Sequence, residues 1–243
     1  MIPCISVANM RESDRKTIET RVPSLTLMYR AAMGLFRAAD WRGKTVIAVG
    51  GGNNGGDGFA LACILRERGC DCRVVTLSAH LSPDSAHFAE RATRLGVPVS
   101  AYVPGAFSGS DTLVDCLLGT GFSGEVREPY SAAIREMNAS GARIISVDIP
   151  SGMNGDTGEA QTAVRSDLTV TIGFVKNGLI TANAGNYISR LVCADIGIAL
   201  DREENWICAA GECTEKPAAP GTLFPAPEWL DLQPIRVTDV ADP

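Results

Sequence analysis

The chain of 243 residues has no long apolar run and few aromatic side chains, which make up 6% of the sequence. No run approaches the roughly 18–20 apolar residues that a membrane-spanning helix needs, and no segment resembling a secretory signal peptide opens the sequence. Hydrophobic residues make up 45% and charged residues 21%, which is typical of globular proteins and argues against general disorder. We therefore expect a globular, cytoplasmic protein that does not bind membranes.

The spacings typical of disulfide frameworks and zinc sites are also missing. The eight cysteines include no C-x-x-C pair, and the closest patterns, at residues 70–72 and 208–213, are followed by neither a second pair nor a histidine. We expect most of the cysteines to be small buried apolar residues. The only two histidines, His80 and His87, lie near a polar helix start, and there we expect solvated surface residues rather than members of a catalytic triad.

A basic surplus is missing as well. The formal net charge of −6 comes entirely from residues 201–243, which hold nine acidic and three basic residues, whereas residues 1–200 hold 19 of each. Nucleic-acid binding depends on an excess of basic residues that contact phosphates, and the sequence offers no such excess. The C-terminal segment also holds six of the 13 prolines but only two of the 25 glycines. This shift predicts one domain over residues 1–200, followed by an acidic, proline-rich and poorly ordered extension over residues 201–243.

Short apolar runs alternate with helical patterns within residues 1–200. The runs are apolar on both faces, as expected for strands of a parallel sheet that helices cover on both sides. This rhythm predicts an α/β fold with a mostly parallel, doubly wound sheet, preceded by helical segments over residues 9–39. The expected strands cover residues 45–49, 73–77, 112–117, 143–147, 168–172 and 191–193, and the expected helices cover residues 56–68, the segment after 82–84, and 130–139.

A glycine-rich segment, GGGNNGGDG at residues 50–58, follows the first expected strand. It contains G-x-G-x-x-G between a strand and a helix, where glycines let the backbone approach a pyrophosphate and the helix N-terminus supplies free N–H groups. The segment indicates a nucleotide-type ligand, although some glycines could serve tight packing alone. The second strand ends in LSA and lacks the acid that holds the ribose in NAD-dependent dehydrogenases, which disfavours an oxidoreductase.

Acidic residues end two other expected strands. Because ligands bind outside the carboxyl ends of the strands in such sheets, we expect these two strand ends and the glycine-rich segment to converge on one cleft. Asp115 and Asp148 would each need hydrogen-bond donors, a counter-charge or water if buried there. Asn54, Asp115 and Ser151 could together offer amide, carboxylate and hydroxyl oxygens to a hard cation. Their single negative charge favours a monovalent ion over magnesium. Two alternatives stay open: Asp148 could merely cap a turn, and Lys176 could contact a phosphate or lie at the surface.

An ordered series of motifs resembles one known family. The motifs are VGGGNNGGDGFALA, DCLLGTGFSGEVREPY, SVDIPSG, DLTVTIGFVKNGL and ADIGIAL, and they are similar to those of the NAD(P)H-hydrate epimerases, the YjeF N-terminal domain family. The resemblance implies a Rossmann-like three-layer αβα sandwich, commonly a homodimer. It also implies an isomerase that interconverts the R and S epimers of hydrated NADH and NADPH in metabolite repair. Many relatives continue into a fused dehydratase domain, so here we expect the dehydratase activity from a separate protein or from a missing part of the chain.

Matching the motifs residue by residue, the resemblance implies a potassium ion, one per subunit, held by Asn54, Asp115 and Ser151. Asp148 is our candidate catalytic residue, because a carboxylate there could assist departure of the substrate hydroxyl and return of water. The rival interpretation is a non-catalytic scaffold of the same family, which loss of these site residues would favour. The residues implied to bind the substrate are Asn53, Asn54, Gly55, Gly56, Asp57, Gly119, Thr120, Gly121, Phe122, Ser123, Gly124, Glu125 and Asp148.

Overall fold

The computed structural model describes residues 2–208, 222–225 and 232–238, and within them the main sheet has eight strands whose pairings are all parallel. In sheet order the strands are β12 (Leu232–Arg236), β9 (Leu191–Asp195), β7 (Leu168–Ile172), β6 (Arg143–Val147), β5 (Thr112–Cys116), β2 (Thr45–Val49), β3 (Cys72–Thr76) and β4 (Val99–Ala101). A smaller sheet joins β11 (Thr222–Pro225), β10 (Asn205–Cys208), β1 (Ile2–Ile5) and β8 (Val175–Lys176) in that order. The predicted parallel sheet is confirmed.

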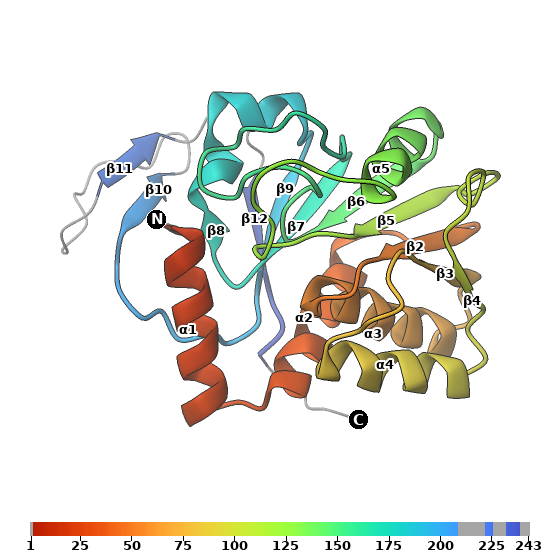
Figure 1. Cartoon of the computed structure of the whole chain (residues 1–243). Coiled ribbons are helices and arrows are strands. Elements are labelled where there is room, and N and C mark those ends of the chain that lie inside the picture. Colours follow the sequence, from red (N-terminus) through yellow and green to blue (C-terminus); the bar gives the residue numbers. More distant parts are fainter. Residues whose placement is uncertain (1, 209–221, 226–231, 239–243) are drawn as a thin grey trace.

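The helices of the described residues form layers on both sides of the main sheet. They are α1 (Val7–Thr20), α2 (Ser24–Ala38), α3 (Asn53–Glu67), α4 (Pro83–Arg94), α5 (Tyr130–Ala139) and the short 3-10 helices η1 (Asn177–Ile180) and η2 (Ala182–Asn186). Helices α2, α3 and α4 cover one face of the sheet and α5 covers the other (Figure 1). The structure therefore confirms the three-layer αβα arrangement, in which α1 stands beside the sandwich.

Local sequence signals explain where several helices begin. Ser82 caps α4, its side chain accepting a hydrogen bond from the backbone N–H of Ser85, and Pro83 occupies the first helical position, which suits its fixed φ angle and missing N–H. Ser6 caps α1 in the same way through the N–H of Asn9. Capping by serine satisfies N–H groups that the first helical turn leaves free.

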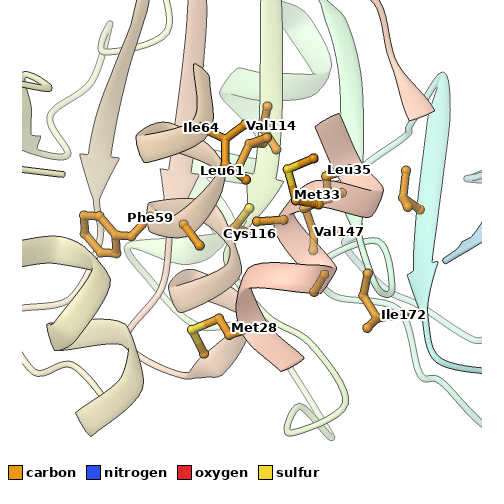
Figure 2. Packing of buried hydrophobic residues seen from close by; sticks show 14 of the residues in the cluster. Met28, Met33, Leu35, Phe59, Leu61, Ile64, Val114, Cys116, Val147 and Ile172 are labelled. Atoms are coloured by element: carbon orange, nitrogen blue, oxygen red, sulfur yellow. The ribbon is translucent and has the colours of Figure 1, made fainter. Parts of the chain in front are cut away.

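The largest hydrophobic core lies between the sheet and helices α2 and α3 (Figure 2). Helix α3 is apolar around most of its surface because it packs on the sheet and between α2 and α4, and such a helix is expected to be buried on all sides. A second cluster packs α5 on the opposite face, with Ile134 and Met137 fully buried. The two clusters hold the three layers together.

The order of the strands creates a reversal at the centre of the sheet. From β2 the chain runs outward through β3 to β4, then returns to place β5 on the other side of β2 and continues to β6, β7 and β9. The loop after β2 therefore leads to α3 on one face of the sheet, and the loop after β5 leads toward α5 on the other face. In open α/β sheets, ligands bind in the crevice that opens at this point.

The described parts of the C-terminal extension join both sheets. Strand β10 pairs with β1, and β12 pairs with β9 at the edge of the main sheet. Glu204 accepts hydrogen bonds from the backbone N–H and the hydroxyl of Ser6, at 2.6 and 2.9 Å. These pairings attach the described parts of residues 201–243 to the domain formed by residues 1–200. Residues 209–221, 226–231 and 239–243 lie outside the description, so the poor order expected of the extension as a whole stays a prediction.

The expectations about histidine and cysteine side chains are confirmed in the described residues. His80 and His87 are exposed. Six cysteines are free thiols, of which Cys70 is half-buried and the rest buried. The part of the chain that the structure describes contains no cluster of three or more His, Cys, Asp or Glu residues suited to a metal ion, and none of its helices is long and apolar enough to cross a bilayer.

The packing of α2 on β9 depends on a glycine. A Cβ atom on Gly34 would lie 2.7 Å from the Cβ of Ala194, which is fixed to the strand backbone and cannot rotate away. Overpacking of this kind costs about 1–3 kcal/mol, which exceeds the gain of about 1 kcal/mol that alanine has over glycine inside a helix. We expect Gly34→Ala to lower the free energy of unfolding by about 1–2 kcal/mol in urea denaturation.

The control for this prediction is a double-mutant cycle. Ala194→Gly removes the opposing methyl group, so the variant carrying both substitutions should lose less stability than the sum of the two single variants. Strictly additive losses would contradict close packing between these two residues.

Candidate functional site

A cleft of about 760 Å³ opens at the central reversal of the sheet. The loops after β2 and β5 form one side of it, α1 and α2 line another, and Asp148 and Lys176 contribute to its lining from the ends of β6 and β8. The three sequence segments expected to converge therefore do so. Nine of the residues predicted to bind the substrate line the cleft: Asn53, Asn54, Asp57, Gly119, Thr120, Gly121, Phe122, Ser123 and Asp148.

Four other predicted residues do not line the cleft. Gly55 and Gly56 are buried in the first turn of α3, where a Cβ on Gly55 would lie 2.1 Å from the carbonyl oxygen of Gly50. Gly124 and Glu125 are exposed beyond the end of the lining loop. The first pair serves packing, so the alternative interpretation of the glycines as a packed turn is correct for part of the segment.

The two loops at the reversal touch through Gly50. Its N–H donates to the carbonyl oxygen of Cys116 at 3.0 Å, and a Cβ atom on it would lie 2.0 Å from the carbonyl oxygen of Leu117. Only glycine fits there. Helix α3 begins three residues later at Asn53, after Gly52, so the free N–H groups of its first turn lie beside the cleft.

Asp115 is buried behind the cleft, with no exposed surface. Its carboxylate accepts hydrogen bonds from the N–H and hydroxyl of Ser151, from the hydroxyl of Ser146 at 2.8 Å and from the N–H of Leu117 at 3.3 Å. All of these donors are neutral. Burial raises the pKa of Asp115, and the hydrogen bonds from Ser151 and Ser146 oppose that rise. The carboxylate is therefore solvated by hydrogen bonds but is not neutralised by any of these four donors.

The other two residues predicted to bind a cation converge on the same place. The side-chain amide of Asn54 donates to the carbonyl oxygen of Leu118 at 3.0 Å, and the hydroxyl of Ser151 accepts from the N–H of Leu118 at 2.8 Å. The amide oxygen of Asn54 is buried and has no hydrogen-bond partner among the described residues. An unpartnered buried oxygen is costly, and together with the carboxylate of Asp115 it forms an oxygen-rich set that suits a hard monovalent cation.

Asp148 has a backbone conformation that is uncommon for its type. Its φ angle is 67°, in the left-handed region that Asp tolerates better than most residues but that still carries strain. Its N–H donates to the carbonyl oxygen of Val170 at 2.8 Å, and its carboxylate accepts from the N–H of Ile172 at 3.2 Å. Both partners lie on the neighbouring strand β7, so Asp148 does more than cap its own turn.

Lys176 is fully buried, and the interpretation as a surface residue is wrong. Its ammonium group donates to the carboxylate of Asp148, to the hydroxyl of Thr171 at 3.0 Å and to the carbonyl oxygen of Ile172 at 2.7 Å. An ammonium group has three protons to donate, and these partners use all three. The geometry therefore favours an internal counter-charge for Asp148 over the phosphate contact that the sequence also allowed.

Two charged cleft residues on α1 were not predicted from the sequence. Asp14 is half-buried and Arg11 is exposed, and both line the cleft. The guanidinium of Arg11 donates to the carbonyl oxygen of Thr120, which joins α1 to the loop after β5. Met10, Asp14 and Ile18, which line the cleft, recur at intervals of four residues. This spacing places them on one helix face, a signal that could have been read from the sequence.

Carboxyl groups in the cleft perturb one another. Burial raises the pKa of Asp57 well above its usual range, and the nearby charges of Asp148 and Asp14 raise it further, while Lys176 opposes them. Burial likewise raises the pKa of Asp14, with Asp148 adding to the effect. Strongly perturbed carboxyl groups in a cleft are typical of a functional site.

A known protein family matches this chain. The family described as "YjeF-related protein N-terminus" matches residues 24–178. This chain belongs to that family. The match includes the glycine-rich segment, the loop after β5, Asp148 and Lys176, so most of the cleft's sheet side lies within the YjeF-related region.

Several relatives within this YjeF-related family are close in sequence. A protein of Limosilactobacillus fermentum named NAD(P)H-hydrate epimerase is 36% identical over 202 residues, which cover 79% of this chain and 95% of the relative. One of the same name from Lentilactobacillus buchneri is 35% identical over 207 residues, covering 82% and 96%. A bifunctional NAD(P)H-hydrate repair enzyme of Coxiella burnetii is 36% identical over 197 residues, which are 78% of this chain but 40% of that enzyme.

A solved structure supports the fold. The crystal structure of the yeast protein YNL200c matches with a TM-score of 0.64 at 21% identity, over 72% of this chain and 82% of the yeast chain. At this identity the likeness supports the α/β architecture alone.

The ion pair at the floor of the cleft leads to a prediction about stability. Lys176→Met would leave the buried carboxylate of Asp148 without its counter-charge, and breaking a buried pair from one side costs about 3–5 kcal/mol. We expect Lys176→Met to lower the free energy of unfolding by about this amount in urea denaturation.

A matched control removes both charges. Asp148→Asn keeps the shape of residue 148 and tolerates a left-handed backbone, so the variant Asp148→Asn/Lys176→Met should be more stable than Lys176→Met alone. Equal losses in the single and double variants would mean that the two side chains are not coupled.

Proposed function

We propose that this chain is an NAD(P)H-hydrate epimerase, an isomerase that interconverts the R and S epimers of hydrated NADH and NADPH in metabolite repair. Two relatives with this name are 36% and 35% identical and are matched over 95% and 96% of their own lengths. Their name favours catalysis over the scaffold that the sequence also allowed. The structural observation that carries the proposal is the carboxylate of Asp148, which Lys176 holds at the edge of a dinucleotide-sized cleft.

The dinucleotide would lie along the reversal between β2 and β5. The free N–H groups and positive dipole end of α3 suit a pyrophosphate, and Asn53, Thr120 and Phe122 line the same cleft. Their amide, hydroxyl and ring would supply polar and stacking contacts. The second strand ends without a ribose-binding acid, which fits a coenzyme bound as a substrate to be repaired and argues against a bound redox cofactor.

The reaction that we propose inverts one carbon without oxidation or reduction. The lone pair of the ring nitrogen expels the C6 hydroxyl and forms a cationic iminium ring, after which water adds to the opposite face of C6. The carboxylate of Asp148 would stabilise the developing positive charge and exchange a proton with the departing or returning oxygen. Lys176, which touches Asp148 inside the protein, would keep this carboxylate oriented.

Potassium belongs to the same proposal. Asn54, Asp115 and Ser151 would hold the ion, and the fit rests on the buried, unpartnered amide oxygen of Asn54 and the neutral surroundings of the Asp115 carboxylate. When bound, the ion would supply positive charge that balances Asp115. The chain's own contribution is to bring the loops after β2, β5 and β6 to one point, which fixes Asn54 beside the cleft.

We further propose a homodimer, a cytoplasmic location and cooperation with a separate dehydratase that consumes the S epimer. Support for the last point comes from the Coxiella burnetii relative, whose name describes a bifunctional repair enzyme and of which this chain matches 40%. A second activity would then lie in another part of such proteins.

The activity test uses the pure S hydrate of NADH and follows the appearance of the R form by chromatography. We expect the protein to speed this conversion, and we expect Asp148→Asn to lower kcat by about 100- to 1,000-fold, because loss of a proton-transferring group has effects of this size. As a control, Asp167→Asn alters an exposed carboxylate at the other end of β7 and should leave kcat within about twofold of the parent. An Asp148→Asn variant as active as the parent would remove this residue from the mechanism.

The potassium proposal has a test that does not depend on activity. Ions that bind only the folded state raise its melting temperature, so KCl should raise the Tm of the parent protein more than LiCl of equal ionic strength. In the Asn54→Leu variant, which removes the unpartnered oxygen, the difference between the two salts should disappear. Equal melting temperatures of the parent protein in both salts would contradict a potassium site.

A further inference from the structure

Inversion at C6 requires proton transfer on both faces of the nicotinamide ring, which is more than one carboxylate can provide from a fixed position. The hydroxyl leaves from one face and needs a proton there, while the incoming water must lose a proton on the opposite face. Because the enzyme interconverts both epimers, each position must act as an acid in one direction and as a base in the other. Asp148 lies at the end of β6, so the second group must come from a different element of the cleft.

Three carboxyl groups line the cleft, and their surroundings differ. Asp148 is paired with the buried ammonium of Lys176. Asp57, on α3, and Asp14, on α1, line the same cleft, and within the described residues neither carboxyl group takes part in a hydrogen bond or ion pair. Two carboxyl groups in one site, one paired with a cation and one without a counter-charge, are the arrangement expected of a base and an acid.

We propose that Asp57 is a second catalytic residue, which transfers a proton on the face of the ring opposite to Asp148. This inference rests on the proposed epimerase function. Asp57 is favoured over Asp14 because it lies one turn into α3, at the reversal where the loops after β2 and β5 meet. An ionised carboxylate so near the helix N-terminus would repel a pyrophosphate bound there, whereas a protonated one would not.

The electrostatic surroundings agree with a protonated Asp57. The groups that act on it are Asp14 from α1, Asp84 from α4, Asp148 at the end of β6 and Lys176 on β8, and burial together with the three acids raises its pKa. Because a raised pKa keeps the proton bound at higher pH, the acid form of Asp57 persists to higher pH than that of an exposed carboxyl group and is lost as the pH rises through this pKa.

In the proposed step, one carboxyl group gives a proton and the other takes one. Asp57 gives its proton to the C6 hydroxyl, the C6–O bond breaks with formation of the N1=C6 double bond, and water leaves. A second water forms a new C6–O bond on the opposite face, the electron pair returns to N1, and Asp148 takes the proton. The two carboxyl groups then exchange protons with water in the open cleft before the next turnover in the same direction.

The experiment compares Asp57→Asn with Asp14→Asn, which makes the same substitution on another wall of the cleft. For the conversion of the S hydrate, Asp57→Asn should lower kcat by about 100-fold or more with KM within about threefold, whereas Asp14→Asn should lower kcat by less than about fivefold. The parent should lose activity as the pH rises through the raised pKa of Asp57, and this limb of the profile should be absent from the residual activity of Asp57→Asn. Asp57→Glu should restore part of the rate.

Three results overturn the inference. Asp57→Asn could keep kcat within fivefold of an active parent, which would exclude proton transfer by Asp57. Equal losses in Asp57→Asn and Asp14→Asn would attribute the effect to a general disturbance of the cleft lining. A parent protein that does not epimerise the hydrate would overturn the proposed function itself. This failure is distinguishable from the other two results because the parent protein is assayed before any variant. Thermal melts show whether Asp57→Asn is folded, which we expect because an amide replaces a protonated carboxyl group of the same shape.

Discussion

The contact between two loops at the centre of the sheet is the constraint on which the site depends. Gly50 meets the backbone of Leu117 so closely that no side chain fits at residue 50, and this contact joins the loop after β2 to the loop after β5. Because the loops meet there, Asn54 reaches the backbone of Leu118, which in turn contacts Ser151. One close approach of two backbone segments therefore brings together the cleft, the oxygen-rich set of Asn54 and Asp115, and the N-terminus of α3.

A second constraint places a charge inside the protein. Lys176 lies on β8, which pairs with β1, and from there its ammonium reaches Asp148 at the end of β6. The small sheet therefore supports the carboxylate of Asp148 from behind, while α1, which follows β1, supplies the wall that holds Asp14 and Arg11. Asp148 adopts a left-handed backbone, and the buried counter-charge and the strand β7 together keep it in that conformation. Strain and charge are concentrated at the position where the proposed chemistry takes place.

The sequence predicted those parts of the structure that depend on local patterns. Apolar runs predicted the strands of the parallel sheet other than β4 and β12, and the rule that ligands bind at carboxyl ends of strands brought Asn54, Asp115, Asp148 and Ser151 toward one place. Lys176 was not placed, because its burial depends on a two-residue strand that pairs with a segment about 170 residues earlier, which leaves no periodic pattern. Strand β12 was missed for a related reason: it lies in the proline-rich extension, where composition argues against a strand. Asp14 was missed although its helical spacing was visible.

In the proposed reaction, the cleft inverts C6 of a hydrated nicotinamide coenzyme by loss and return of water. Oxygen isotope exchange tests this most directly. When the S hydrate is converted in water enriched in oxygen-18, mass spectrometry should find one atom of solvent oxygen at C6 in every molecule of R product formed by the enzyme. R product that retains the original oxygen would contradict departure of the hydroxyl, and with it the role of the carboxyl groups that line the cleft.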